Sequence, residues 1–281
     1  MEERPLVLFT LLLQAAVGAA WVFTGLEWWL PAPPGALSGP GWNGVAALAL
    51  LGTLASFAHL GVPANAWRAA SNWRTSWLSR EILCAGVFTG AALGAALAAP
   101  AGWPGVAVMA RMAALATCPL LLHCMAKAYR LATVPAWDRP ITPLAFFSTA
   151  LLLGVLCGGV LLAAASGLPP EPVRRAWSWL AGAALVLTLG HLGLTALWLA
   201  RLPEEVRSVI LVRHARLFKA RLALAGGGAA AAALLLAFPG SGLGTWELRL
   251  AALGAIAGSE ALARTLFYAG QVPQGVYLNK G

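Results

Sequence analysis

The sequence predicts an all-α fold, a polytopic membrane helical bundle of eight transmembrane helices. Hydrophobic residues make up 60% of the 281 residues and charged residues only 10%, whereas a soluble domain carries about 25% charged residues. The apolar residues also gather in long runs, and a helix needs about 20 mostly apolar residues to span a membrane. Because these runs fill the chain, we expect a single integral membrane domain over residues 1–281.

Eight apolar runs meet this length requirement, and each is bounded by a recognisable break. The predicted spans are roughly 6–30, 43–64, 80–99, 104–128, 143–167, 175–200, 217–238 and 248–270. The breaks after spans one, three, five and seven are rich in proline and glycine, at residues 31–35, 100–102, 167–170 and 239–242. Inside the spans, small residues such as those at 226–231 allow helix backbones to approach one another closely.

The breaks after spans two, four and six carry most of the positive charge. These breaks and their flanks hold Arg68, Arg74, Arg80, Lys127, Arg130, Arg139, Arg201, Arg207, Arg213, Arg216, Lys219 and Arg221. The other breaks hold Arg174, Arg175 and Arg249. The positive-inside rule therefore predicts an inner (plasma) membrane protein with both termini on the cytoplasmic side. A docking surface for an acidic partner is the alternative explanation.

The net charge of +9 does not indicate nucleic-acid binding, because the arginines are scattered at helix ends without a contiguous basic arm. The four cysteines, Cys84, Cys118, Cys124 and Cys157, lie inside apolar runs and form no CxxC pair. An iron–sulfur site needs clustered thiolates, and a disulfide framework needs paired loop cysteines. We therefore expect the chain itself to hold neither, and no metal.

One junction concentrates ionisable groups at one membrane face. His59 closes the second span and Glu81 opens the third. Ionisable groups at membrane depth are costly unless paired, so they are functional candidates. Structural explanations are also open: His59 can donate to a backbone carbonyl, and Glu81 can favour the start of a helix after Ser79.

Four stretches of sequence, taken together, resemble one protein family. They are residues 5–10 with Gln14 and Gly18, residues 59–63 with 66–67 and 76–82, residues 129–130 with 133–137, 142–143 and 146–147, and Glu260 with Arg264, Phe267 and Tyr268. The ordered set resembles the DmsC family, the membrane anchor subunits of dimethyl sulfoxide reductase-type molybdoenzymes. Eight spans is that family's number.

The resemblance implies a role in anaerobic respiration. Such anchors bind and oxidise menaquinol, and they pass the electrons to a ferredoxin-like iron–sulfur subunit with four clusters. That subunit serves a molybdopterin catalytic subunit, which determines the terminal acceptor, so the chain alone is not expected to act on the terminal substrate. His59 and Glu81 match the family residues tied to quinol binding. Asn65 stands where the family often has a basic residue, and Arg68, one helical turn on, is the candidate replacement.

Quinol oxidation releases two protons and two electrons, so the site needs groups that accept protons near neutral pH. Histidine and a carboxyl in apolar surroundings both meet this need. We predict that His59 binds and deprotonates the quinol, with Glu81 as hydrogen-bond partner or proton acceptor. Tyr129 and Arg130 end the fourth span on the same face, and Trp137 follows. These three can line the quinol pocket, or they can be interfacial aromatics and a snorkelling arginine.

Other charged residues inside the spans suggest further contacts and different functions. Glu260 and Arg264 have the spacing of an intrahelical ion pair, and Arg111 needs a partner such as Glu27 or a backbone carbonyl. A haem b anchor using two of His59, His123 and His191 is an alternative function, although the resemblance implies no haem. A polysulfide reductase-type quinone-linked anchor and a transporter also stay open as functions.

Overall fold

A computed structural model describes residues 4–30, 37–57, 66–164, 170–237 and 245–271. Within these ranges the chain is a bundle of helices without a strand. The long helices are α1 (Arg4–Trp29), α2 (Ser38–Phe57), α4 (Trp77–Ala98), α5 (Pro104–Ala128), α6 (Ile141–Ala164), α7 (Pro170–Ala200), α9 (Ala215–Ala237) and α10 (Thr245–Ala269). Shorter elements are α3 (Ala66–Ser71), α8 (Glu204–Ser208) and a π-helical turn, Val209–Arg213.

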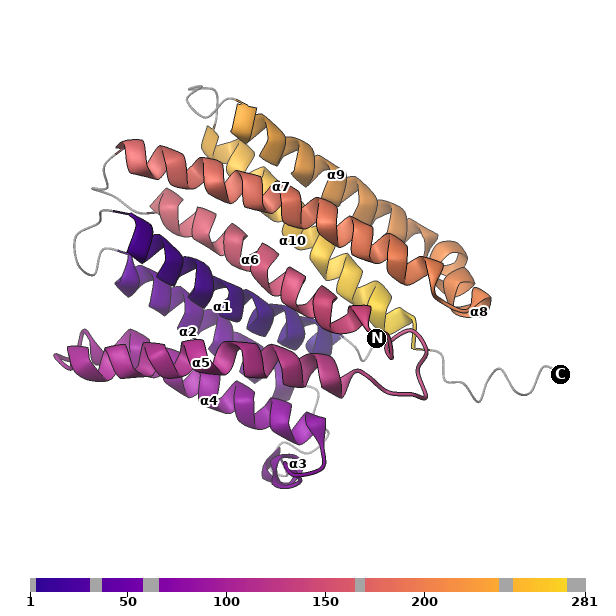
Figure 1. The fold of residues 1–281 in the computed structure, drawn as a ribbon, viewed down its shortest axis with the longest axis horizontal. Coiled ribbons are helices and arrows are strands. Elements are labelled where there is room, and N and C mark those ends of the chain that lie inside the picture. The colour runs from indigo at the N-terminus through magenta and orange to yellow at the C-terminus, as the bar shows by residue number, and fades with distance from the viewer. Residues whose placement is uncertain (1–3, 31–36, 58–65, 165–169, 238–244, 272–281) are drawn as a thin grey trace.

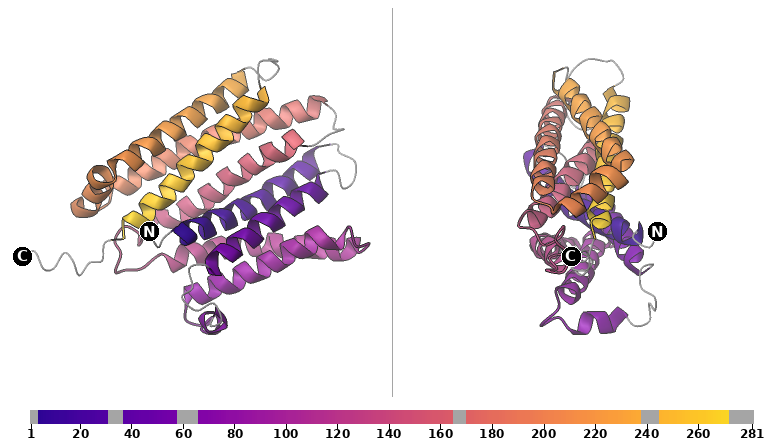
Figure 2. Two further views of the ribbon diagram at one scale, coloured as in Figure 1. Left: turned by 180° about the vertical axis from the view of Figure 1, so that it is seen from behind. Right: turned by 90° about the vertical axis from the view of Figure 1, so that its right-hand side faces the viewer.

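The long helices lie side by side and run along a common direction (Figure 1). Helices α4 and α5 pack together at one side, α1 and α2 come next, α6 follows, and α7, α9 and α10 form the other side. Views from behind and from one end show the same order (Figure 2). The elements α3 and α8 both lie at the end of the bundle where α5 ends and α6 begins, which we call the basic end because it gathers the arginine-rich connections.

Seven of the described helices are long and apolar enough to cross a membrane. They correspond to predicted spans one and three to eight, so the all-α membrane bundle is confirmed. The predicted second span corresponds to α2, whose first turns contain Pro40 and Asn43 and which falls short of the apolar length of a span within the described residues. Residues 58–64 of that predicted span lie outside the described residues, so eight spans is one more than the structure shows.

The starts of α7 and α4 differ from the predicted boundaries for local reasons. α7 begins at Pro170, five residues before the predicted span. Proline suits the first turn of a helix and Glu171 favours its positive end, so the helix begins before the apolar run does. α4 begins at Trp77, where Ser76 caps it by accepting a hydrogen bond from the Ser79 backbone N–H at 3.3 Å.

Candidate functional site

The structure describes part of the junction that the sequence singled out. His59 lies outside the described residues. Arg68 lies on the short helix α3 and its side chain is exposed. The hydroxyl of Ser79 donates a hydrogen bond to the Ala69 carbonyl at 2.5 Å, so α3 is held against the first turn of α4. This contact fixes the segment that leads into Glu81.

Glu81 lies inside the bundle, in the second turn of α4. Its side chain is only 1% exposed. The Oε1 atom is buried and has no hydrogen-bond partner among the described residues. A buried polar atom without a hydrogen-bond partner lowers the stability of the folded state by roughly 1–3 kcal/mol. A donor that reached this oxygen would remove that cost.

Five aromatic rings form a compact cluster at the basic end of the bundle, and we call it the aromatic cluster. Its members are Tyr129, Trp137, Phe146, Phe267 and Tyr268. Tyr129 and Trp137, both predicted site residues, meet edge to face with ring centroids 5.5 Å apart. The Tyr268 hydroxyl donates to the Tyr129 oxygen at 2.7 Å, and the Trp137 indole N–H donates to the Phe267 carbonyl at 2.7 Å. These contacts join the ends of α5, α6 and α10.

Electrostatics connects Glu81 with this cluster. Burial raises the pKa of the Tyr129 phenol well above its ordinary value, and the neighbouring Tyr268 and the Glu81 carboxylate raise it further. Tyr129 therefore keeps its proton at neutral pH and can act as a hydrogen-bond donor. Tyr129 and Trp137 thus contact each other, and Glu81 is near enough to Tyr129 to influence its pKa.

Arg130 has a different surrounding from the other predicted residues. Its guanidinium forms an ion pair with Asp138 at 3.1 Å, and both side chains are about one-third exposed, 32% and 36%. The adjacent Arg139 donates to the Pro135 carbonyl at 2.9 Å. These contacts hold the connection between α5 and α6 in place, with Arg130 at its surface.

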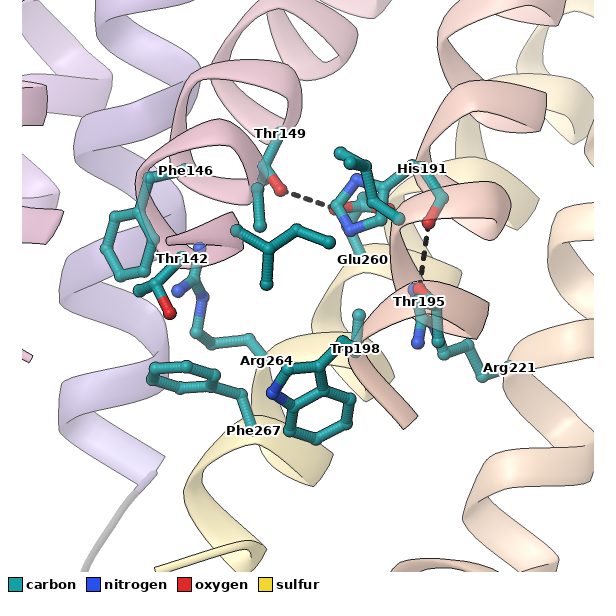
Figure 3. Close-up of a pocket in the computed structure, with 14 residues that line it drawn as sticks. Thr142, Phe146, Thr149, His191, Thr195, Trp198, Arg221, Glu260, Arg264 and Phe267 are labelled. Carbon is teal, nitrogen blue, oxygen red and sulfur yellow. Dashed lines mark hydrogen bonds and ion pairs between the residues drawn. The ribbon is translucent and has the colours of Figure 1, made fainter. Parts of the chain in front are cut away.

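A second buried group of polar side chains lines a cavity of about 60 Å³ among α6, α7, α9 and α10 (Figure 3). Phe146 and Phe267 belong both to this cavity and to the aromatic cluster. The Thr149 hydroxyl donates to Glu260 Oε2 at 2.8 Å, and His191 Nδ1 lies 3.4 Å from the same oxygen. The three side chains converge on one wall of the cavity.

The predicted ion pair between Glu260 and Arg264 is wrong for the described residues. Arg264 instead donates to the Gln14 amide oxygen on α1 at 2.7 Å, and its guanidinium lies 4.0 Å from the Phe146 ring centroid. Gln14 in turn donates to the Phe146 carbonyl at 3.0 Å. Helical spacing permits the intrahelical pair, but buried neighbours on α1, α6 and α7 supply the partners. Of the two kinds of partner left open for Arg111, the structure shows Glu27, with the Arg111 Nη1 and Glu27 Oε1 atoms 3.9 Å apart.

Sequence reasoning missed the joint role of His191, Thr149, Thr195 and Arg221 as cavity walls. Each is a polar residue inside an apolar run, and this was the one available signal. His191, a candidate haem ligand by sequence, faces Glu260, whereas His123 packs edge-on against Trp77 with centroids 5.5 Å apart. Among the described residues no group of three or more histidine, cysteine or acidic side chains has a metal-binding arrangement.

Comparison with known proteins decides the family. A family model described as the DMSO reductase anchor subunit (DmsC) matches residues 1–269. The chain belongs to this anchor family. Together with the span-length apolar helices, this membership makes it an integral membrane protein with the role of a membrane anchor.

Three known proteins resemble the chain over part of their length. A sulfite dehydrogenase subunit of Allochromatium vinosum is 32% identical over 203 residues, or 64% of this chain. The anaerobic dimethyl sulfoxide reductase component YnfH of Escherichia coli is 33% identical over 177 residues, or 58% of this chain. A component of the anaerobic dimethyl sulfoxide reductase of Haemophilus influenzae is 32% identical over 168 residues, also 58% of this chain. Each alignment spans 59% of the relative's length.

Proposed function

We propose that the chain binds and oxidises menaquinol at the basic end of the bundle and passes the electrons to an iron–sulfur subunit. In this proposal the terminal reduction takes place on a molybdopterin subunit. The observation that carries the proposal is the buried Glu81, whose Oε1 has no hydrogen-bond partner among the described residues. A quinol hydroxyl is a donor of the kind that this oxygen requires.

The neighbourhood of Glu81 suits an aromatic headgroup. The aromatic cluster presents ring faces and edges that pack against a flat ring. Tyr129 keeps its phenolic proton and can hydrogen-bond a quinol or quinone oxygen. Arg68 and Trp137 are proposed to border the headgroup, and Arg130, paired with Asp138, to help hold the connection beside it.

The proposed reaction assigns each proton and electron a destination. Menaquinol loses two protons and two electrons and becomes menaquinone. One proton goes to Glu81, and the second goes to His59, which lies outside the described residues. The electrons go to the iron–sulfur subunit, which would dock at the basic end near the site, where edge-to-edge distance to the quinol is shortest.

A second direction of electron flow is the alternative, because one similar protein is named a sulfite dehydrogenase subunit. A dehydrogenase withdraws electrons from its substrate, so the same membrane site would then reduce menaquinone. Glu81 would deliver a proton instead of accepting it. Assaying the complex with a menaquinol analogue and with a menaquinone analogue distinguishes the two directions.

The test uses membranes that contain the complete complex with Glu81→Gln. We expect electron transfer between the menaquinol analogue and the partner subunits to fall by roughly 100-fold or more, because general base catalysis contributes about 10²–10⁴. A water-soluble one-electron dye that reaches the partner subunits directly should give wild-type activity.

The matched control is Glu247→Gln, an exposed acid in the first turn of α10 at the opposite end of the bundle. It should leave both activities unchanged. Normal quinol-driven activity in the Glu81→Gln complex, in both directions of electron flow, would remove the basis of the proposal.

A further inference from the structure

The cavity among α6, α7, α9 and α10 contains two deeply buried guanidinium groups. Arg221 on α9 is 4% exposed and Arg264 on α10 is 6% exposed. Among the described residues that line this cavity, Glu260 is the one carboxylate. Figure 3 shows the two arginines on different sides of the space, with Glu260 between His191 and Thr149. The lining therefore carries more cations than anions.

The hydrogen bonds of these side chains do not neutralise that excess. Glu260 accepts from Thr149 and lies beside His191, and no arginine nitrogen comes within 4.0 Å of it in the described part of the chain. Arg264 donates to an uncharged amide, and Arg221 Nη2 donates to the Thr195 hydroxyl at 2.6 Å. The Nε atom of Arg221 is buried without a partner among the described residues. One guanidinium donor of a residue that lines the cavity thus has no acceptor in the described part of the chain.

A buried guanidinium is stable when an anion accepts its hydrogen bonds, and phosphate and carboxylate groups match its forked donors. Ligand pockets typically combine mostly apolar walls with a few placed polar groups. The walls beside the arginines are apolar and aromatic, with Leu194, Trp198 and Phe267. A cavity of about 60 Å³ with such walls has room for a small anionic group beside Arg221.

We infer that this cavity binds a phosphate-type oxyanion held by Arg221, with Arg264 supplying further positive charge. The oxyanion comes either from the headgroup of an anionic phospholipid or from free phosphate. The site adjoins the aromatic cluster through Phe146 and Phe267, but its polar groups differ from Glu81 and it does not rest on the proposed quinol chemistry. The test of this anion site measures binding, so the inference can fail or succeed independently of the proposed electron transfer.

The experiment measures thermal unfolding of the full protein in a neutral detergent. The probes are low-millimolar inorganic phosphate, with chloride at matched ionic strength as its reference, and phosphatidylglycerol, with phosphatidylcholine as its reference. At about 100-fold excess over Kd, binding should raise the unfolding temperature by roughly 5 °C or more. A shift with phosphatidylglycerol alone identifies a lipid as the source, and a shift with phosphate identifies the free anion.

The decisive variant is Arg221→Met, and the matched control is Arg216→Met, which removes an exposed arginine from the same helix. Arg221→Met should show no shift with either probe and should unfold no earlier than the wild type in anion-free detergent, because it no longer buries an unpaired charge. Arg216→Met should respond as the wild type does.

Equal shifts in the wild type and Arg221→Met, or no shift of the wild type with either probe, would overturn the inference. Should Arg221→Met fail to fold, Arg221→Lys replaces it, because lysine keeps the charge but loses the forked donors. Arg221→Lys should then bind the active probe at least roughly tenfold more weakly than the wild type, and equal affinity would contradict the proposed role of Arg221.

Discussion

At the scale of single residues, the buried polar side chains find partners on distant segments of the sequence. Tyr129 at the end of α5 meets Tyr268 on α10, and Gln14 on α1 meets Arg264. Apolar surroundings make each such contact important, since a group that loses its partner cannot turn to water. Glu81 differs from these four residues, because its Oε1, like the Nε of Arg221, has no partner among the described residues. Because of that difference, we expect Glu81 to contact a ligand, and we expect the hydrogen bond between the two tyrosines to stabilise the fold.

The tyrosine pair leads to a prediction for a double-mutant cycle. Tyr129→Phe and Tyr268→Phe each leave one buried hydroxyl without its partner, so each should lower the free energy of unfolding by about 1–3 kcal/mol. The double variant should lose less than the sum of the two, because no orphaned hydroxyl remains. Thermal unfolding of the purified protein in detergent measures all three; strictly additive losses would contradict a coupled pair.

At the scale of elements, α1 and α6 approach each other closely at two glycines. A methyl group on Gly18 would overlap the Ala150 carbonyl oxygen, and one on Gly154 would overlap the Gly18 carbonyl group. The two backbones therefore touch where glycine leaves room, as small residues permit in membranes. This contact places α6, with Phe146 and Thr149, against the helix that carries Gln14.

Gly18→Ala should destabilise the protein by about 3 kcal/mol or more, because the added methyl would meet backbone atoms that cannot rotate away. Gly90→Ala on α4 is the matched control, since no atom lies within 4 Å of its added methyl group. The control should change stability by no more than about 1 kcal/mol, in the stabilising direction expected for alanine in a helix. Unfolding temperatures that do not separate the two variants would show that α1 and α6 can move apart freely.

At the scale of the whole molecule, the two ends of the bundle differ in charge. The connections at the basic end carry Arg74, Arg139, Arg201 and Arg207, alongside α3 and α8. The turn between α4 and α5 at the opposite end is uncharged, from Ala99 to Trp103. The proposed quinol site and the anion-binding cavity both lie toward the basic end, so the charge asymmetry coincides with the candidate chemistry.

The positive-inside rule predicts that the basic end faces the cytoplasm. A cysteine placed at exposed Ala101 should then react with a membrane-impermeant maleimide in intact cells, whereas one at exposed Arg201 should react after the membrane is opened. The unmodified protein measures the background from its own four cysteines. The reverse labelling pattern would place the basic end outside and assign its arginines to partner docking.

The sequence by itself determined the fold class, the family and most of the helix boundaries. Its prediction for α5 agrees with the structure at both ends, Pro104 and Ala128, because apolar length and a proline at the first helical position are local properties. It also selected Glu81, Tyr129 and Trp137, since ionisable and aromatic residues at span ends stand out among apolar neighbours. The predicted start of α7 was five residues too late. The prediction followed the apolar run, which shows where the chain enters the membrane core, whereas the helix already begins at Pro170 and Glu171.

Only the tertiary structure decided which buried groups meet. Sequence spacing assigned Glu260 to Arg264, yet Glu260 contacts Thr149 and His191, while Arg264 contacts Gln14, 250 positions away in the sequence. The cavity with Arg221 was invisible for the same reason, since its walls come from four helices. Helix periodicity fixes neighbours within one helix, whereas partners across helices depend on crossing geometry and on the shared need to satisfy polar groups away from water.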